Sequence, residues 1–234
     1  VRVYLDLDPA FNQLWNAAEG IDVGLEGHTH FATVGQLLGH PTCDVPTCGR
    51  TWITTLPPVV LERWPYAATT RRRSFTTVGN WRSYGSIEYH GRRFGQRAHS
   101  LRQLAGIASS STYRFEVALA IHEEERDDIA LLRHHGWRLL DPKPASRTPS
   151  AYRAFIQGSY AEICIAKSGY VESRCGWFSD RSACYLASGR PVVAQDTGFG
   201  RALPVGEGLL AFGDTAEAVS AADAVCANYE DHRA

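Results

Sequence analysis

Hydrophobic and polar positions follow two different patterns, which change near residue 74. Before it, Val, Tyr and Leu at residues 1–7 predict a buried strand, and a short helix is expected over 11–18. The text from 20 to 58 is rich in Gly, Pro, Thr, His and Cys, so it predicts mostly loops, with a helix at 32–38 and a strand at 51–55.

After residue 74 apolar runs of strand length alternate regularly with helical patterns. The expected strands cover residues 74–79, 115–121, 137–140, 161–167, 191–196 and 209–212. The expected helices cover residues 97–105, 123–135, 149–159 and 180–188, with a closing helix over 216–233. This alternation predicts an α/β fold, a Rossmann-like parallel sheet flanked by helices, preceded by a partial, loop-rich N-terminal portion.

The stretch between 57 and 73 contains three prolines and the run Arg71 to Arg73. Such a segment is typical of a connection between domains, so we expect one domain over 1–73 and another over 74–234. A run of three arginines is more often a solvated loop than a phosphate or lipid site, and a solvated loop is its expected role here.

Charge and composition exclude several classes of protein. The 24 basic and 25 acidic residues nearly cancel, so neither nucleic acid nor an anionic membrane is expected as a partner, with the run Arg71 to Arg73 as a local exception. No apolar segment reaches the roughly 18–20 residues that span a bilayer, and no signal pattern opens the chain, so we expect a cytoplasmic protein without a membrane span. The absence of methionine and the uncapped closing helix predict that both ends are cut.

Ligands of parallel α/β sheets bind beyond the carboxyl ends of the strands, where helix N-termini favour phosphate. The loops after Val78, Ile121, Lys167 and Gln195 are therefore the expected binding loops. In the segment 176–191, a loop is followed by a helix start capped at Ser179 or Asp180, a stop at Gly189 and a buried strand from Pro191.

This segment resembles the donor-binding C-terminal domain of GT-B glycosyltransferases, particularly the family 4-like group. That group has a Glu-Gly-Phe-Gly-like loop, a helix with a second Glu and a Gly-x-Pro-Val strand. Trp177, Phe178 and Ser179 occupy the loop, and Gly189-Arg190-Pro191-Val192 matches the strand. The loop at Gly79 and Asn80 and the helix and strand over 152–166 extend the resemblance, which implies a metal-independent enzyme that needs no cofactor beyond its nucleotide-sugar donor.

Both glutamates of the family pattern are missing, because Gly176 and Cys184 stand in their places. Asp180 and Glu172 are the carboxylates expected to substitute for them. The segment from Cys175 to Ser179 also resembles the His-Cys-Gly-Trp-Asn-Ser box of family 1 enzymes, with Arg174 where that box has His.

Several residues are expected to hold the donor. Lys167 and Arg181 are predicted to contact the diphosphate, because a metal-free enzyme needs cations where charge develops on the leaving group. The turn Asp196-Thr197-Gly198 is expected to line the cleft near the sugar hydroxyls, with a plain turn as its alternative. His122 is expected either to face the diphosphate or to cap the helix that follows.

For the acceptor, His28 or His30 is the predicted general base, with a structural loop histidine as the alternative. Together with His40, Cys43 and Cys48 these histidines also suggest a zinc site. Their spacing is not that of common structural zinc sites, so no metal is expected. Asp6-Leu7-Asp8 resembles the opening motif of haloacid-dehalogenase-like phosphatases, but a later lysine and acidic pair are missing.

These features together predict a glycosyltransferase that moves a sugar from a nucleotide sugar to an acceptor small molecule or glycan. Residues 74–234 would bind the donor, and residues 1–73 would form an incomplete acceptor side. The alternative is a non-catalytic, degenerate GT-B module that binds a nucleotide, a glycan or a protein partner.

Overall fold

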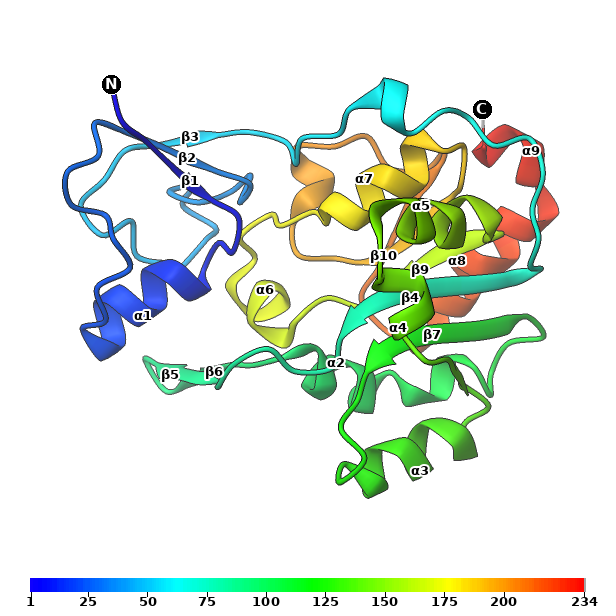
Figure 1. The fold of residues 1–234 in the computed structure, drawn as a ribbon. Helices are drawn as coiled ribbons and strands as arrows, with labels where there is room; N and C mark the ends of the chain where they lie inside the picture. Colours follow the sequence, from blue (N-terminus) through cyan, green and yellow to red (C-terminus); the bar gives the residue numbers. More distant parts are fainter. Residues whose placement is uncertain (234) are drawn as a thin grey trace.

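The structure, a computed structural model, describes residues 1–233 and contains two parallel sheets (Figure 1). The small sheet has the order β1 (Val3–Asp6), β2 (His30–Thr33), β3 (Trp52–Thr54). The large sheet comprises β4 (Ser74–Asn80), β7 (Arg114–Ala120), β8 (Arg138–Leu139), β9 (Ala161–Cys164), β10 (Val192–Gln195) and β11 (Leu209–Phe212). A hairpin of β5 (Ile87–Tyr89) and β6 (Arg92–Phe94) extends below the small sheet in Figure 1.

The large sheet has the strand order of a doubly wound dinucleotide-binding fold. Its six strands are all parallel and lie in the order β8-β7-β4-β9-β10-β11. Numbered along the chain this is 3-2-1-4-5-6, in which the chain leaves β4 towards one edge and returns to β9 on its other side. The reversal opens a crevice between the carboxyl ends of β4 and β9, so the predicted α/β, Rossmann-like class is confirmed.

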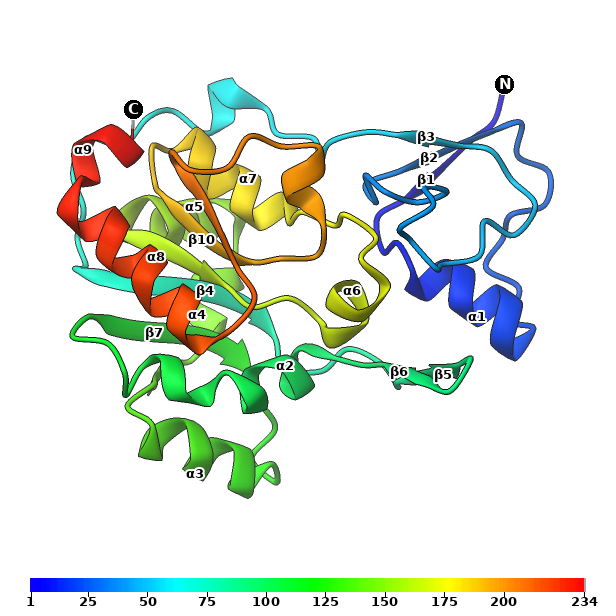
Figure 2. The same ribbon diagram turned by 180° about the vertical axis from the view of Figure 1, so that it is seen from behind.

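Helices cover both faces of this sheet because its strands are apolar on both sides (Figure 2). Val117 and Leu119 of β7 pack into one cluster, and Ala118 between them packs into the other. The first face carries α2 (Arg97–Gln103), α3 (Arg126–His134) and α8 (Thr215–Ala227), together with the short helix η2 (Ala105–Ile107). The second face carries α4 (Lys143–Ser146), α5 (Pro149–Gly158) and α7 (Asp180–Ala187).

The remaining helices lie outside these two layers. They are α1 (Phe11–Glu19), α6 (Ser168–Ser173), α9 (Tyr229–His232), η1 (Leu61–Arg63) and η3 (Phe199–Arg201). Among residues 1–233 no helix combines the length and the hydropathy that crossing a bilayer requires.

The small sheet does not have a hydrophobic core of its own. Phe11 and Leu14 of α1 pack in one cluster with Ile87 and Phe94 of the hairpin and Tyr170 of α6. Apolar packing therefore continues across residue 74, and the boundary expected there stays a prediction.

One predicted element is wrong. The helix expected over 32–38 is absent, because Phe31 and Thr33 alternate as buried residues of β2, which ends at Thr33. Leu37 and Leu38 are buried, but in a turn in which the Leu37 amide donates to the Cys175 carbonyl at 2.9 Å. The hairpin β5–β6 and helix α6 have no counterpart in the predicted elements.

Candidate functional site

A cavity of about 340 Å³ lies where the carboxyl ends of the two sheets face one another. The small sheet contributes residues just past the ends of its first two strands. The segment that follows it and the large sheet complete the lining, which comprises Leu5, Leu7, Asp8, Val34, Pro57, Pro58, Arg97, Lys167, Tyr170, Trp177, Phe178, Ser179, Asp180 and Arg181. The cavity thus lies at the crevice that the strand order of the large sheet opens.

Arg97 is a buried cation at this crevice. It is 8% exposed, its Nε donates to the Ile165 carbonyl at 2.9 Å and its Nη1 to the Asn80 carbonyl at 2.5 Å. Burial and then the charge of Arg181 lower the pKa of Arg97 to about 10. No Asp or Glu within residues 1–233 forms an ion pair with it. A desolvated guanidinium without a counterion favours an anion in the cavity.

Gly79 lets two guanidinium groups approach the end of β4. A Cβ atom at this position would lie 2.8 Å from Nη1 of Arg97 and 3.6 Å from Nη1 of Arg181. In the predicted loop at the end of β4, Gly79 thus leaves space for the two guanidinium groups, and the Asn80 carbonyl accepts from Arg97.

Arg181 lines the cavity but is engaged mainly with the sheet. Its Nε lies 2.5 Å from Oε1 of the fully buried Glu162, and Nη1 donates to the Val78 carbonyl at 3.2 Å. Burial lowers the pKa of Arg181, but Glu162 together with Cys164 and Tyr152 raises it, and the net pKa lies well above its ordinary value. The guanidinium thus has a structural partner, and its role toward a diphosphate stays a prediction.

Lys167 is held by a cluster that spans the two sheets. Its Nζ lies 3.2 Å from both carboxylate oxygens of Asp8 and also donates to the hydroxyl of Tyr84. Asp8 accepts from Tyr84 at 2.5 Å and from Tyr170. Burial lowers the pKa of Lys167, and Asp8 opposes that shift. In this arrangement Asp8 occupies the place that an anionic ligand of Lys167 would take.

The predicted donor loop lies at the cavity wall. Trp177 stacks on Tyr170 with 4.3 Å between ring centroids, and Phe178 is buried beside it. Ser179 caps α7 by accepting from the Arg181 amide at 3.2 Å, which places Asp180 in the first turn at the cavity. The N-terminus of this helix therefore opens into the same space as the two arginines.

Two predicted regions do not line the cavity. The Asp196 carboxylate accepts from the Gly198 amide at 2.7 Å, and Thr197 donates to the Trp177 carbonyl at 2.5 Å, so this segment is the plain turn given above as its alternative. A Cβ at Gly198 would lie 2.8 Å from Leu37, which shows how closely this turn packs on the small sheet's side. His122 is exposed, its Nδ1 accepts from the Glu124 amide at 3.3 Å, and it lies before α3 without capping that helix.

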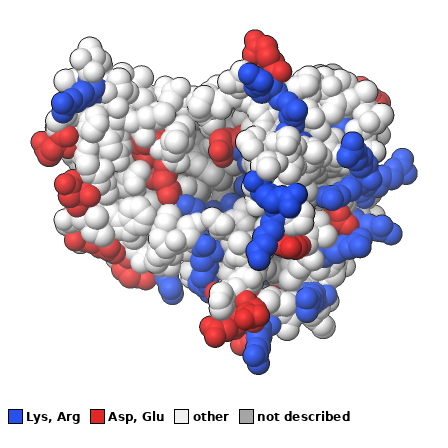
Figure 3. Space-filling model, in the orientation of Figure 1, with Lys and Arg blue, Asp and Glu red and all other residues white. Residues whose placement is uncertain are grey.

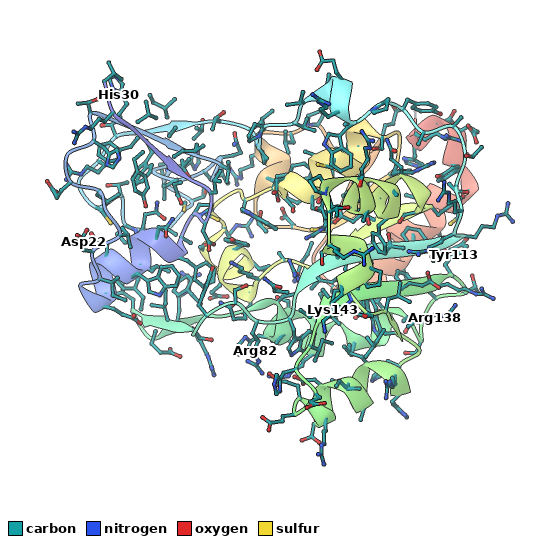
Figure 4. All side chains as sticks on the ribbon, viewed as in Figure 1. Asp22, His30, Arg82, Tyr113, Arg138 and Lys143 are labelled. Atoms are coloured by element: carbon teal, nitrogen blue, oxygen red, sulfur yellow. The ribbon has the colours of Figure 1, made fainter. Side chains whose placement is uncertain are left out.

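The two histidines predicted as the base lie at the end of the small sheet away from the cavity, His30 in β2 and His28 just before it. His30 opens β2 and pairs with Val3, whereas the cavity lies beyond Thr33, about 10 Å further along the strand. Figure 4 places His30 near the N-terminus, at the far end of the small sheet. His28 packs edge-on against Tyr4 with 5.3 Å between centroids. Since a base must reach the acceptor hydroxyl, the placement of both histidines argues against that role.

The other sequence alternatives find no support either. Within residues 1–233 no three His, Cys, Asp or Glu side chains gather as a metal site, and His40 instead contacts Thr42 at 2.8 Å. Asp6 is fully buried and accepts only from neutral groups, so it holds the small sheet together. Glu172 is paired with Arg92 at 2.7 Å, outside the cavity.

Sequence reasoning missed Arg97, Tyr84 and Tyr170. Arg97 could have been found from its position, because it is a basic residue at the start of α2, the helix that follows the first strand of the large sheet. No local pattern pointed to the two tyrosines, because they act through Asp8, which lies more than seventy positions earlier in the chain.

No protein-family model and no curated protein matches the chain. Among solved structures the chain is similar to AviGT4, a glycosyltransferase involved in avilamycin A biosynthesis, at 16% sequence identity and a TM-score of 0.47. The match covers 80% of this chain and 52% of that structure, so the chain spans about half the length of the protein it matches.

Proposed function

We propose that this chain binds a nucleoside diphosphate sugar in the cavity between the two sheets and transfers the sugar to an acceptor. The observation that carries the proposal is Arg97, a buried guanidinium without a carboxylate partner among residues 1–233, at the crevice of a doubly wound sheet. Residues 74–234 would hold the donor, and residues 1–73 would form the acceptor side.

Charge develops on the leaving diphosphate when the bond between sugar and phosphate breaks. Fixed donors aimed at that position lower the barrier, since they need no reorganisation during the reaction. Arg97 and the first turn of α7 supply such donors, and Lys167 adds a third when it exchanges Asp8 for the diphosphate. The enzyme would thus need no metal to stabilise the leaving group.

Asp8 is the residue on the acceptor side that meets the donor side. Its carboxylate points across the cavity to Lys167, 3.2 Å away. Once a diphosphate engages Lys167, this carboxylate can orient the acceptor hydroxyl or accept its proton. Asp8 therefore replaces the histidines as the candidate base.

A non-catalytic nucleotide-binding module is the second candidate. The missing family glutamates favour it, since Gly176 packs against Leu37 and Cys184 is a thiol whose pKa burial raises to about 12. Lys167 is also already paired with the carboxylate of Asp8 in the structure. A module of this kind would bind the nucleotide without releasing sugar.

Calorimetric titration with a panel of nucleoside diphosphates and their parent nucleosides tests the proposal. We expect one diphosphate to bind at least about tenfold more tightly than its nucleoside, because charge-assisted contacts act only on the phosphates. Hydrolysis of the matching nucleotide sugar then separates an enzyme from a binding module. Absence of binding for every diphosphate at millimolar concentration would refute both candidates.

A further inference from the structure

A second cationic region lies at the opposite edge of the large sheet, where the strands begin. Three adjoining hollows of about 550, 270 and 380 Å³ share their walls there. Six arginines line them, and we call these residues the arginine surface: Arg71, Arg72, Arg73, Arg114, Arg138 and Arg153. Figure 3 shows Lys and Arg gathered over this half of the molecule, and Figure 4 places Arg138 and Lys143 on it.

Most charges of the arginine surface are unneutralised. The only carboxylates lining the hollows are Glu116 and Asp141. Glu116 is already engaged with Arg138 at 3.0 Å and with the Ser74 hydroxyl at 3.0 Å. Among residues 1–233 the other five arginines of the surface form no ion pair. The balancing acidic residues lie elsewhere: residues 1–58 contain two Arg and six Asp or Glu.

Apolar groups accompany these arginines. The largest hollow has a floor that includes Phe155, over which Arg72 lies at 4.9 Å from the ring centroid. The connecting segment exposes Val60, Leu61 and Tyr66 by 58, 63 and 57%. This segment lies along α5, because Gln157 donates to the Pro65 carbonyl at 2.8 Å and Arg153 to the Arg63 carbonyl at 3.1 Å.

We propose that the arginine surface docks the protein on an anionic phospholipid bilayer. Guanidinium groups take phosphate oxygens in a forked geometry, and each basic residue near an anionic leaflet strengthens binding. Stable attachment needs a second, apolar contribution, which Val60 and Leu61 supply and which Tyr66 extends at the depth of the headgroups.

The arrangement favours a bilayer over other polyanions. A single-stranded nucleic acid needs a series of exposed aromatic rings on which successive bases stack. Phe155 in the hollows is buried under Arg72, and Tyr66 beside them is a single exposed ring. A protein interface places apolar groups centrally and charges at the rim, whereas here the arginines are central and the apolar residues lie along one side.

Docking at this edge leaves the cavity open to water. β4 begins at the arginine surface and ends at Asn80 beside Arg97, and its seven residues span roughly 20 Å. The cavity would therefore face away from the bilayer at about that height, and the docking surface and the binding site can be tested separately.

Sedimentation with vesicles tests the proposal. We expect the protein to bind vesicles that contain anionic phospholipid and not zwitterionic ones. Replacing Arg71, Arg72 and Arg73 together by Gln should weaken binding by about 100-fold, since each basic residue contributes about a fivefold effect. Leu61→Ser should weaken binding to the same vesicles by a smaller factor and leave its salt dependence unchanged.

The matched control replaces Arg2, Arg126 and Arg201 by Gln, which removes the same charge from exposed positions outside the arginine surface. It should retain most of the binding. Equal loss in the two triple variants, binding to zwitterionic vesicles, or no binding to anionic vesicles would overturn the proposal. Tighter binding to a single-stranded oligonucleotide than to anionic vesicles, with the same dependence on Arg71 to Arg73, would overturn it in favour of nucleic acid.

Discussion

The two parallel sheets present opposite charges at the ends that face each other. In the small sheet, Asp6 is fully buried and accepts from Asn12, Gln13 and Thr33, so its carboxylate is used by the fold itself. At the crevice of the large sheet, Arg97 is nearly as buried but donates only to backbone carbonyl oxygens. Both carboxylate oxygens of Asp6 are engaged and the residue does not line the cavity, so its charge serves stability. Arg97 lines the cavity without a counterion among residues 1–233, so its charge is available to a ligand.

The sharpest test of this distinction is the buried pair in the large sheet, Arg181 and Glu162. Glu162→Ala should lower the free energy of unfolding by about 3–5 kcal/mol, because it leaves the guanidinium of Arg181 buried without its partner. Urea denaturation measures this loss. The double variant Glu162→Leu with Arg181→Met should recover most of it, and a loss below about 1 kcal/mol in the single variant would contradict a structural role.

Arg97 should show the reverse behaviour. Arg97→Met is expected to reduce diphosphate affinity by about 10- to 100-fold, since a charge-assisted contact contributes about 1.5–3 kcal/mol. The free energy of unfolding without ligand should stay unchanged or rise, because the variant removes a desolvated charge. Titration and urea denaturation measure the two quantities, with Arg126→Met as the exposed control. A large loss of stability with affinity intact would make Arg97 another structural arginine.

The free energy of unfolding should fall at alkaline pH, because Cys175 is buried in the cluster that joins the two sheets. Burial raises the pKa of the Cys175 thiol to about 12 from its ordinary value near 9. As the pH rises, the thiol therefore loses its proton in the unfolded chain before it does so in the folded protein. The contribution of this thiol to the free energy of unfolding is complete below pH 9 and falls by about 1.4 kcal/mol per pH unit above it. Urea denaturation between pH 8 and 10 should show a shallower slope for Cys175→Ala than for the wild type, and parallel slopes would exclude this thiol as the cause.

The sequence predicted the large sheet well because each of its strands is a local apolar run between helical patterns. Asp180, Trp177 and Lys167 line the cavity, since loops that follow parallel strands meet at one edge, and their contact with a donor stays a prediction. The direction in which a side chain points could not be predicted in the same way. Arg181 turns toward Glu162, nineteen positions earlier in the chain, and no rule of sequence spacing predicts that pair.

The distribution of charge could not be predicted, because net charge says nothing about it. Arg71 to Arg73 are exposed, as expected of a solvated run, but the fold adds Arg114 and Arg138 from the starts of two other strands. Ser74 pairs with Arg114, and Glu116 with Arg138, so the register of three strands creates the cluster. The arginine surface is thus a property of the fold and not of any segment.

Asp8 links the two sheets, and its removal should have a smaller, two-sided effect. Asp8→Asn should increase diphosphate affinity by about 3- to 10-fold, because it frees Lys167 from a partly exposed ion pair worth roughly 1 kcal/mol. Turnover should nevertheless fall if Asp8 orients the acceptor or takes its proton. Titration and a transfer assay separate these effects, and unchanged affinity would mean that the diphosphate does not use Lys167.

The smallest effect is expected at His30, at the far end of the small sheet. His30→Ala should leave turnover within about twofold of the wild type and stability within about 0.5 kcal/mol, because the side chain is exposed and remote from the cavity. His28→Ala is the matched comparison, since that ring packs on Tyr4 and its loss should lower stability by about 1 kcal/mol without changing turnover per folded molecule. A general base would behave differently. A fall in turnover of about 10²- to 10⁴-fold in either folded variant, with donor affinity intact, would restore the histidine as the base and remove Asp8 from that role.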